Sequence, residues 1–286
     1  MNNSEIELVK YRDFSDVFNG SFAFISQEMK QLFRVIGIYA GVPVIVSVIL
    51  SALYAQDTMA TVMEIMNGGN TAGPDPVLIF LTFLVSFVAQ VFIGGLVPAY
   101  LGEYEDKGRN GFTAADVWNR FARHFWAIVG YSLLAALLLM LGFVFLIIPG
   151  IYLSVPFSFI LYVKVIENKD LGDTLSRCFQ LVKNRWWATF GIIILAYLIM
   201  GIVGWLFSLP SMIVGGIEGY MVASGAKEAM EGGSLAIVLS TIFAGLGQYL
   251  LYPVLYVIIA FQYYTLREQK DRSGLMDRIS SITGEE

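Results

Sequence analysis

Side chains suited to catalysis are scarce in this chain of 286 residues. It has one histidine, His124, and one cysteine, Cys178. It therefore lacks the second imidazole that a metal site or proton relay would use, and it cannot form an internal disulfide. It contains no His-Glu-x-x-His motif, no serine motif with an imidazole base and no glycine-lysine pattern of a P-loop. We therefore expect no catalytic residues, no metal site, no cofactor and no enzymatic activity.

Two groups of acidic residues leave one enzymatic hypothesis open. They are Glu103, Glu105 and Asp106, and Glu167, Asp170 and Asp173. Carboxylates of this kind could hold a divalent metal, but acidic helix caps and solvated loop charges explain them more simply. A metal-dependent membrane enzyme therefore ranks behind the two hypotheses given below.

Basic and aromatic side chains adjoin each other where two amphipathic segments meet apolar ones. Arg185-Trp186-Trp187 and His124-Phe125-Trp126 have a composition that anchors proteins at the level of lipid headgroups. Specific recognition of a headgroup is the alternative to plain anchoring. Arg34, near the start of another apolar segment, is expected to extend to the same level. The candidate residues for contacts with lipid or a protein partner are Arg185, Trp186, Trp187, His124, Trp126 and Arg34.

Ionisable residues are almost absent from the apolar segments. The exception, Lys164, is close enough to the end of its segment to reach the interface. Because ionisable groups at membrane depth usually mark proton relays and ion pathways, their absence argues against a proton- or sodium-coupled pump. Gln90 and Gln248 are the uncharged candidates for intramembrane contacts. They would either hydrogen-bond between helices, the interpretation we favour, or line a cavity.

Composition places all of these residues in a membrane protein. The chain is 57 % hydrophobic and 14 % charged, and its mean hydropathy of +0.67 is too high for a soluble protein. We predict an all-α bundle of six transmembrane helices arranged as three hairpins. The expected spans are residues 35–55, 77–101, 126–147, 151–166, 188–214 and 235–264. They belong to one membrane domain, residues 14–266, between polar tails at 1–13 and 267–286.

The stretch from Phe125 to Ile166 must turn back on itself. As one helix at about 1.5 Å per residue it would be roughly 63 Å long, about twice the hydrocarbon thickness of a bilayer. Proline removes a backbone donor, and glycine permits the dihedral angles of a tight connection. Pro149 and Gly150 are therefore expected to form the turn between the third and fourth spans.

One plan is repeated in three segments of the chain. In each, an aspartate opens an amphipathic interfacial helix, at Asp16, Asp116 and Asp173, and a hairpin of two spans follows. The second span of each hairpin contains a proline that is expected to kink it. These prolines are Pro98, Pro156 and Pro253. Such repeats commonly surround a site or cavity at a pseudosymmetry axis, although gene triplication without transport produces the same plan.

Basic residues are unevenly distributed between the expected loops. Of the 18 lysines and arginines, all but Lys227 fall on one side of the expected membrane. The positive-inside rule therefore places both termini in the cytoplasm. The polar N-terminal region has no pattern of a signal peptide, and the formal net charge of −5 gives no indication of a nucleic-acid partner.

Several of these residues resemble a known group of membrane proteins. The run Leu146-Ile147-Ile148-Pro149-Gly150-Ile151-Tyr152-Leu153 is followed by Val165-Ile166-Glu167, by Leu171-Gly172-Asp173-Thr174-Leu175-Ser176-Arg177 and by Asn184-Arg185-Trp186-Trp187. Over about residues 103–200 the chain is similar to the bacterial six-helix integral membrane domain joined to some glycerophosphodiester phosphodiesterases, and to related inner-membrane families. Because no phosphodiesterase domain accompanies it in this sequence, hydrolysis is not carried over. The resemblance implies an inner-membrane location and a role around lipids or envelope homeostasis.

Two functional hypotheses remain. The first is a non-enzymatic integral inner-membrane protein that binds membrane lipids or a membrane-protein partner and supports envelope homeostasis, with no nucleic acid involved. The second is a transporter or lipid-translocating protein with a pseudo-threefold central cavity.

Overall fold

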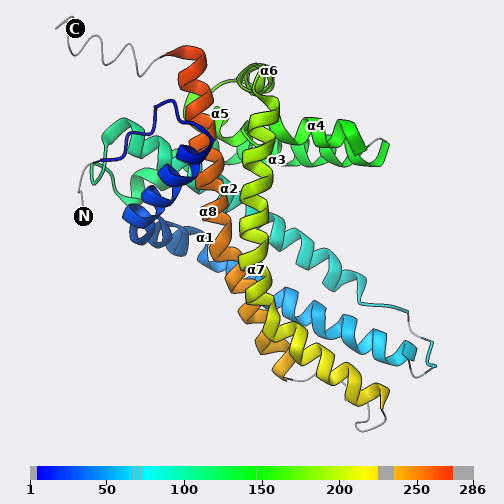
Figure 1. Cartoon of the computed structure of the whole chain (residues 1–286). Helices are drawn as coiled ribbons and strands as arrows, with labels where there is room; N and C mark the ends of the chain where they lie inside the picture. Colours follow the sequence, from blue (N-terminus) through cyan, green and yellow to red (C-terminus); the bar gives the residue numbers. More distant parts are fainter. Residues whose placement is uncertain (1–4, 67, 71, 146, 225–234, 273–286) are drawn as a thin grey trace, which may run out of the picture. The chain divides into compact units, whose positions relative to one another are not determined.

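The computed structural model describes residues 5–66, 68–70, 72–145, 147–224 and 235–272, most of which are helical (Figure 1). The helices are α1 (Phe14–Met66), α2 (Pro76–Lys107), α3 (Ala114–Phe145), α4 (Ile147–Phe157), α5 (Ile160–Glu167), α6 (Leu171–Val182), α7 (Trp186–Ala223) and α8 (Leu235–Asp271). No strand occurs among these residues. The predicted all-α class is confirmed.

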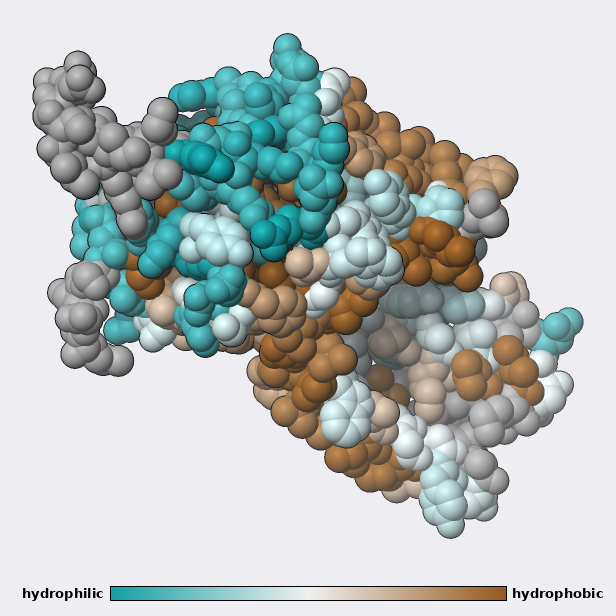
Figure 2. Space-filling view, turned by 45° about the horizontal axis from the view of Figure 1, so that its top comes forward, coloured by the Kyte–Doolittle hydropathy of each residue, from teal (hydrophilic) through white to brown (hydrophobic). Residues whose placement is uncertain are grey.

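Within the described residues, six helical segments are long and apolar enough to cross a membrane, with α4 and α5 counted together as one segment, Ile147–Glu167. This number agrees with the six predicted spans. Figure 2 shows hydrophilic side chains gathered in one area of the visible face and hydrophobic side chains beside this area. The arrangement in three hairpins and the cytoplasmic termini stay predictions.

Several helices are longer than the predicted spans. α1 continues to Met66, beyond the predicted end at residue 55, and α7 continues to Ala223, beyond residue 214. The predicted interfacial helices at Asp16 and Asp116 are the first turns of α1 and α3, which run on into the apolar segments without a break. Only α6, which has Asp173 in its first turn, is separate from the span that follows it. The reason is that residues 56–66 and both junctions contain no proline or cluster of glycines to end a helix.

The turn between α3 and α4 lies earlier than predicted. α3 ends at Phe145 and α4 begins at Ile147, so Pro149 and Gly150 belong to the first turn of α4. Proline is tolerated there because its missing N–H would have no partner within the helix. Gly150 does not have a positive φ. It allows close approach instead, because a Cβ at this position would lie 2.7 Å from the ring of Phe143 and 2.9 Å from its backbone nitrogen.

The described chain divides into two compact units, one from residues 1–39, 93–197 and 253–286 and the other from residues 40–92 and 198–252. We call them unit 1 and unit 2. Unit 1 has an aromatic core, and its largest fully buried side chains include Phe24, Tyr100, Phe121, Phe159, Phe261, Tyr263 and Tyr264. Unit 2 consists of four helical segments, one each from α1, α2, α7 and α8.

Residues 5–13 pack within unit 1, although residues 1–13 were expected to form a polar tail. Leu8 is only 4 % exposed. The backbone N–H of Ile6 donates to the Tyr104 hydroxyl at 3.1 Å, and the backbone N–H of Arg109 donates to a Glu5 carboxylate oxygen at 2.6 Å. The polar sequence did not predict this because a single apolar residue, Leu8, makes the buried contact.

Apolar residues recur every three or four positions along the start of α1, but only some of them are buried within unit 1. Phe14, Phe22 and Met29 are 47, 43 and 47 % exposed. The buried residues are instead Val17, Phe18, Ser21, Phe24, Ile25, Glu28 and Leu32. In a membrane protein apolar side chains face both the protein and the lipid, so hydrophobic periodicity alone does not identify the packed face.

Candidate functional site

An aromatic groove lies where α4 and α7 begin, both in unit 1. Its six lining residues are Ile148, Ile151, Tyr152, Trp186, Trp187 and Phe190, and its volume is about 460 Å³. The Trp186 ring stacks between those of Tyr152 and Phe190, with centroid distances of 5.7 and 4.9 Å. Trp187 is 77 % exposed and Ile148 is 80 % exposed. The structure thus brings together two of the predicted interfacial residues, Trp186 and Trp187.

Trp186 also has a structural role that the sequence did not reveal. Its indole Nε1–H donates to the Tyr152 carbonyl oxygen at 3.2 Å. In an uninterrupted helix that carbonyl would accept from the residue four positions later, but Pro156 has no N–H to donate. Trp186 therefore satisfies the acceptor that Pro156 leaves open. Pro156 lies in the last turn of α4, and the helix breaks at residues 158 and 159 before α5 begins.

The other predicted prolines lie inside continuous helices, Pro98 in α2 and Pro253 in α8. Of the remaining interfacial candidates, Trp126 is 81 % exposed and Arg34 is exposed, so both are available to lipid. His124 is only 7 % exposed and faces the interior of unit 1. The expectation that it contacts headgroups is wrong, because it lies on the buried stripe of α3 with Val117, Phe121 and Ile128.

Three glutamates of unit 1 share one arrangement, in which the carboxylate accepts a tyrosine hydroxyl and pairs with an arginine. The three sets are Glu28 with Tyr100 at 2.6 Å and Arg109 at 2.7 Å, Glu105 with Tyr264 at 3.1 Å and Arg267 at 2.9 Å, and Glu167 with Tyr263 at 2.9 Å and Arg177 at 3.0 Å. Such charge-assisted contacts compensate the loss of hydration of partly buried carboxylates.

Such pairs involve four of the six acidic residues that the sequence left open for a metal, namely Glu103, Glu105, Asp106 and Glu167. Glu103 pairs with Arg120 at 2.8 Å, and Arg120 also contacts Asp106. Glu28, which sequence reasoning overlooked, is only 2 % exposed. The sequence spacing could have predicted its burial. Glu28 lies three residues after Ile25 and four before Leu32, which places it on the same face of α1 as these two residues.

The intramembrane polar candidates lie in unit 2. Gln90 Oε1 is buried without a hydrogen-bond partner among the described residues. Gln248 lies in α8, and its Oε1 would lie 2.8 Å from a Cβ at Gly204 in α7. Bonds between helices are made by residues that sequence reasoning did not name: the Ser47 hydroxyl contacts those of Ser86 at 2.8 Å and Tyr249 at 2.7 Å.

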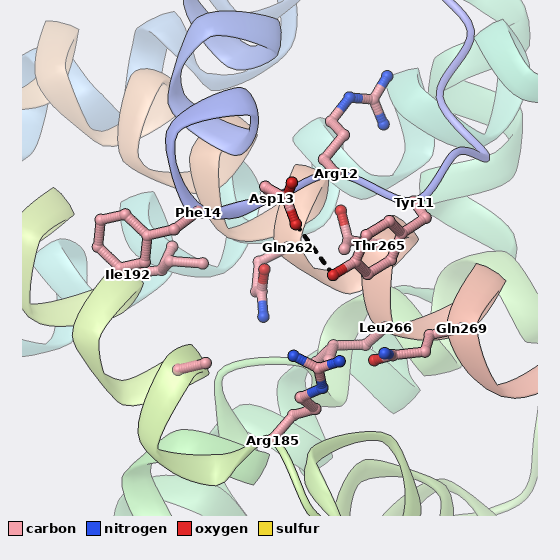
Figure 3. A pocket seen from close by; sticks show the side chains of 11 residues that line it. Tyr11, Arg12, Asp13, Phe14, Arg185, Ile192, Gln262, Thr265, Leu266 and Gln269 are labelled. Atoms are coloured by element: carbon pink, nitrogen blue, oxygen red, sulfur yellow. Dashed lines mark hydrogen bonds between the residues drawn. The ribbon is translucent and has the colours of Figure 1, made fainter.

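A second, more polar pocket of about 330 Å³ lies in unit 1 between the start of α1, the start of α7 and the end of α8 (Figure 3). Its lining residues are Tyr11, Arg12, Asp13, Phe14, Arg185, Ala188, Ile192, Gln262, Thr265, Leu266 and Gln269. Arg185 lies immediately before α7. When the Gln269 amide is turned so that its oxygen faces the guanidinium, Arg185 Nη2 and Nε donate to this oxygen at 2.7 and 3.3 Å. Deeper in the pocket wall, Gln262 Nε2 donates to Thr189 Oγ1 at 2.9 Å.

The two arginines of the polar pocket have different roles. Arg12 donates to the backbone carbonyls of Leu8, at 2.9 Å, of Lys10, at 3.2 Å, and of Glu7, and its guanidinium lies 4.8 Å from the centroid of the Phe261 ring. Burial lowers the pKa of Arg12, but a guanidinium stays protonated at any physiological pH. In Figure 3 the Arg12 guanidinium points away from the other labelled side chains, whereas that of Arg185 points among them. Arg12 thus holds the N-terminal segment in place, and Arg185 is the cation that faces the pocket.

A family model described as a domain of unknown function, DUF7847, matches residues 111–264. The chain belongs to this family. No curated protein and no solved structure matches it.

The range matched by the DUF7847 model contains all six residues of the aromatic groove. The polar pocket lies partly outside this range, because Tyr11, Asp13 and Gln269 belong to the flanking segments. Sequence reasoning had placed Arg185 together with Trp186 and Trp187, since they are consecutive. Arg185 lies in the turn before α7 and lines the polar pocket, whereas Trp186 and Trp187, the first two residues of α7, line the groove.

Proposed function

We propose that this chain is a non-enzymatic integral membrane protein of the bacterial inner membrane, with both termini in the cytoplasm, that binds membrane lipid and supports upkeep of the cell envelope. The observation that carries the proposal is the aromatic groove of unit 1, with Trp187 exposed at its edge. Tryptophan rings favour the membrane interface, where an apolar ring and a polar N–H can both be accommodated.

The composition of the groove favours a lipid chain over a polar ligand. The groove is lined by aliphatic and aromatic side chains, and its volume of about 460 Å³ lies within the range of small-molecule sites. The Nε1–H of Trp186 is already engaged with Tyr152, so this indole is rigid. A rigid apolar surface binds an acyl chain at a lower entropic cost than a mobile one.

The experiment is native mass spectrometry of the purified full chain, with identification of the lipids that remain bound. Trp187→Ala removes the exposed wall of the groove and is expected to weaken lipid retention about tenfold, because burial of a large apolar side chain contributes about 1.5–3 kcal/mol. Trp126→Ala is the matched control, because Trp126 is equally exposed but does not line the groove.

Equal effects of Trp187→Ala and Trp126→Ala would count against the groove and leave only general interfacial anchoring. If a protein is retained in stoichiometric amount and no lipid is, the bound partner is a membrane protein and not a lipid.

A lipid- or solute-translocating protein is the second candidate, and the polar contacts inside unit 2 favour it. Ser47, Ser86, Tyr249 and the buried oxygen of Gln90 supply hydrogen-bonding groups within segments that could span a membrane, where a polar substrate would need them. Proteoliposomes would test this with fluorescently labelled lipid: Gln90→Leu, of similar volume, is expected to slow its movement between leaflets. Movement no faster than in protein-free vesicles would contradict the hypothesis.

A further inference from the structure

The polar pocket of unit 1 has an apolar end and a polar end. Figure 3 shows Phe14 and Ile192 together at one side, and the Arg185 guanidinium with Gln269 at another. Along α7, Ile192 lies seven residues beyond Arg185, which is about 10 Å further into the apolar helix. Residue numbers decrease along α8 in this direction, because Gln269 is beside Arg185 and Gln262 is beside Thr189. Both helices thus become more apolar in the same direction.

That gradient matches the boundary of a bilayer. The headgroup layer on each side of the hydrocarbon is about 5–8 Å thick. If Arg185 lies at headgroup level, Ile192 reaches the edge of the hydrocarbon. The pocket therefore suits an amphiphile with its polar part at Arg185 and its apolar part along Phe14, Ala188 and Ile192.

The charged groups that face the pocket are of opposite sign. The neutral amide of Gln269, with its oxygen turned toward Arg185, orients the guanidinium without cancelling its charge. The Asp13 carboxylate accepts the Tyr11 hydroxyl at 3.0 Å and is exposed. Arg12, the other cation in the wall, is turned toward backbone carbonyls and Phe261. A purely anionic ligand would gain from Arg185 but be repelled by Asp13, and a purely cationic one would meet the reverse.

We propose that this pocket binds the headgroup of a zwitterionic aminophospholipid, with its phosphate on Arg185 and its primary ammonium on Asp13. A guanidinium fork matches two phosphate oxygens, and a primary ammonium donates hydrogen bonds that the methylated ammonium of choline lacks. The pocket volume of about 330 Å³ is at the lower end of the range for small-molecule sites, and suits a headgroup rather than a whole lipid. The apolar end favours a membrane lipid over a soluble phosphate ester. The site shares no residue with the aromatic groove, so it goes beyond the function proposed above.

The test is a competition on the full chain in nanodiscs that contain equal amounts of phosphatidylethanolamine, phosphatidylcholine and phosphatidylglycerol, followed by mass spectrometry of the retained lipid. Phosphatidylethanolamine is expected to be retained at least about tenfold over the other two. Asp13→Asn is expected to reduce retention of phosphatidylethanolamine to the level of phosphatidylcholine, and Arg185→Gln is expected to abolish retention of all three lipids.

Asp16→Asn and Lys183→Gln are the control variants, because both residues are exposed and outside the pocket. Neither should change the amount or the kind of lipid retained.

A second variant tests the pocket without removal of Arg185, in case the Arg185→Gln variant does not fold. Ala188→Phe keeps every charge and fills the apolar side of the pocket from an exposed position, and is expected to reduce retention about tenfold.

Equal or preferred retention of phosphatidylglycerol by the unmodified chain, or an unchanged lipid preference in Asp13→Asn, would overturn the proposal. Displacement of the lipid by millimolar glycerophosphoethanolamine would show that a soluble ester is the ligand, and would overturn the assignment to a lipid. Trp187→Ala should leave the headgroup preference intact, which separates this result from a test of the groove.

Discussion

At the scale of single residues, Trp186 and Trp187 are neighbours with different roles. Trp186 is hydrogen-bonded to the carbonyl that Pro156 leaves without a donor and stacks on Tyr152, whereas Trp187 is 77 % exposed. A proline inside a membrane helix needs another group to satisfy the freed carbonyl, since lipid offers none. Trp186 is therefore part of the fold, and Trp187 is free to contact lipid.

Trp186→Phe is expected to lower the free energy of unfolding by about 0.5–1.5 kcal/mol, because it keeps an aromatic ring but removes the indole donor. Thermal unfolding of the full chain in detergent would measure the difference. Trp187→Phe is the matched control and should lie within about 0.5 kcal/mol of the unmodified chain, as exposed substitutions usually do. An equal loss in both variants would show that the Nε1–H bond contributes nothing.

The repeated set of glutamate, tyrosine and arginine explains why charged side chains are tolerated inside unit 1. Each carboxylate has a guanidinium and a phenol within 3.1 Å. Removal of one partner from a buried pair leaves the other charge uncompensated. The sets join segments that are far apart in the chain, such as Glu105 in α2 with Arg267 in α8, and so hold unit 1 together at the helix ends.

At the scale of elements, the hairpin of α3 and α4 depends on close backbone contact. A Cβ at Gly142 would lie 3.0 Å from the Gly150 Cα. In Figure 1 the two helices lie side by side, as these distances require.

Gly150→Ala is expected to destabilise the fold by about 1–3 kcal/mol, because the added methyl group meets the Phe143 backbone as well as its ring. Thermal unfolding would measure it. Gly130→Ala, in the same helical hairpin, is the control: a Cβ there meets nothing within 4 Å, so the better helix propensity of alanine should leave stability unchanged or raised by up to about 1 kcal/mol. A stable Gly150→Ala variant would argue against this close packing.

The packing of α6 can be followed through its cysteine. Burial is the main cause that raises the pKa of the Cys178 thiol to about 12, and the charge of Glu167 adds to it. The thiolate is the reactive form, so maleimide at pH 8 should label the folded chain only when α6 opens. Ser176→Cys in a Cys178→Ser background, exposed on the same helix, should react at once.

The same shift predicts a pH dependence of stability. The folded pKa lies above the unfolded value of about 9, so the stabilisation from the buried neutral thiol is complete below about pH 9 and declines as the pH rises toward 12. Cys178→Ser should remove this part of the alkaline sensitivity in denaturation measured between pH 8 and 11. Rapid labelling of native Cys178 at pH 8 would contradict the burial.

At the scale of the whole molecule, six apolar helices and the distribution of basic residues make a prediction about topology. Asn70 lies in the connection between α1 and α2, and Asn119 lies near the start of α3; both are exposed. In intact cells, with Cys178→Ser as background, Asn70→Cys should react with a membrane-impermeant maleimide and Asn119→Cys should react only after lysis, because basic segments stay in the cytoplasm. The reverse pattern would refute the predicted orientation. Lys227, the single basic residue predicted on the outer side, lies outside the described residues.

Local pattern was enough to predict the class, the number of spans and the start of α3. Apolar runs of membrane-spanning length predict helices wherever they occur, because a backbone in lipid must satisfy its own hydrogen bonds. Asp116, predicted to open the helix, accepts hydrogen bonds from the backbone N–H and the hydroxyl of Thr113, three residues earlier, at 2.7 Å each. Arg185, Trp186 and Trp187 were also recognisable as a cluster of interfacial residue types.

Tertiary structure decided which side of each helix is packed and what each polar group contacts. In a membrane protein both sides of a helix are apolar, so the sequence did not distinguish the buried Glu28 face of α1 from the exposed face of Phe22 and Met29. His124 was assigned to the interface by its neighbours in sequence, but the rotation of α3 buries it. The polar pocket joins residues 11–13 to residues 262–269, which only the folded chain brings together. Local pattern determines which segments enter the membrane because that depends on transfer from water, whereas the site depends on contacts between segments, which no local pattern contains.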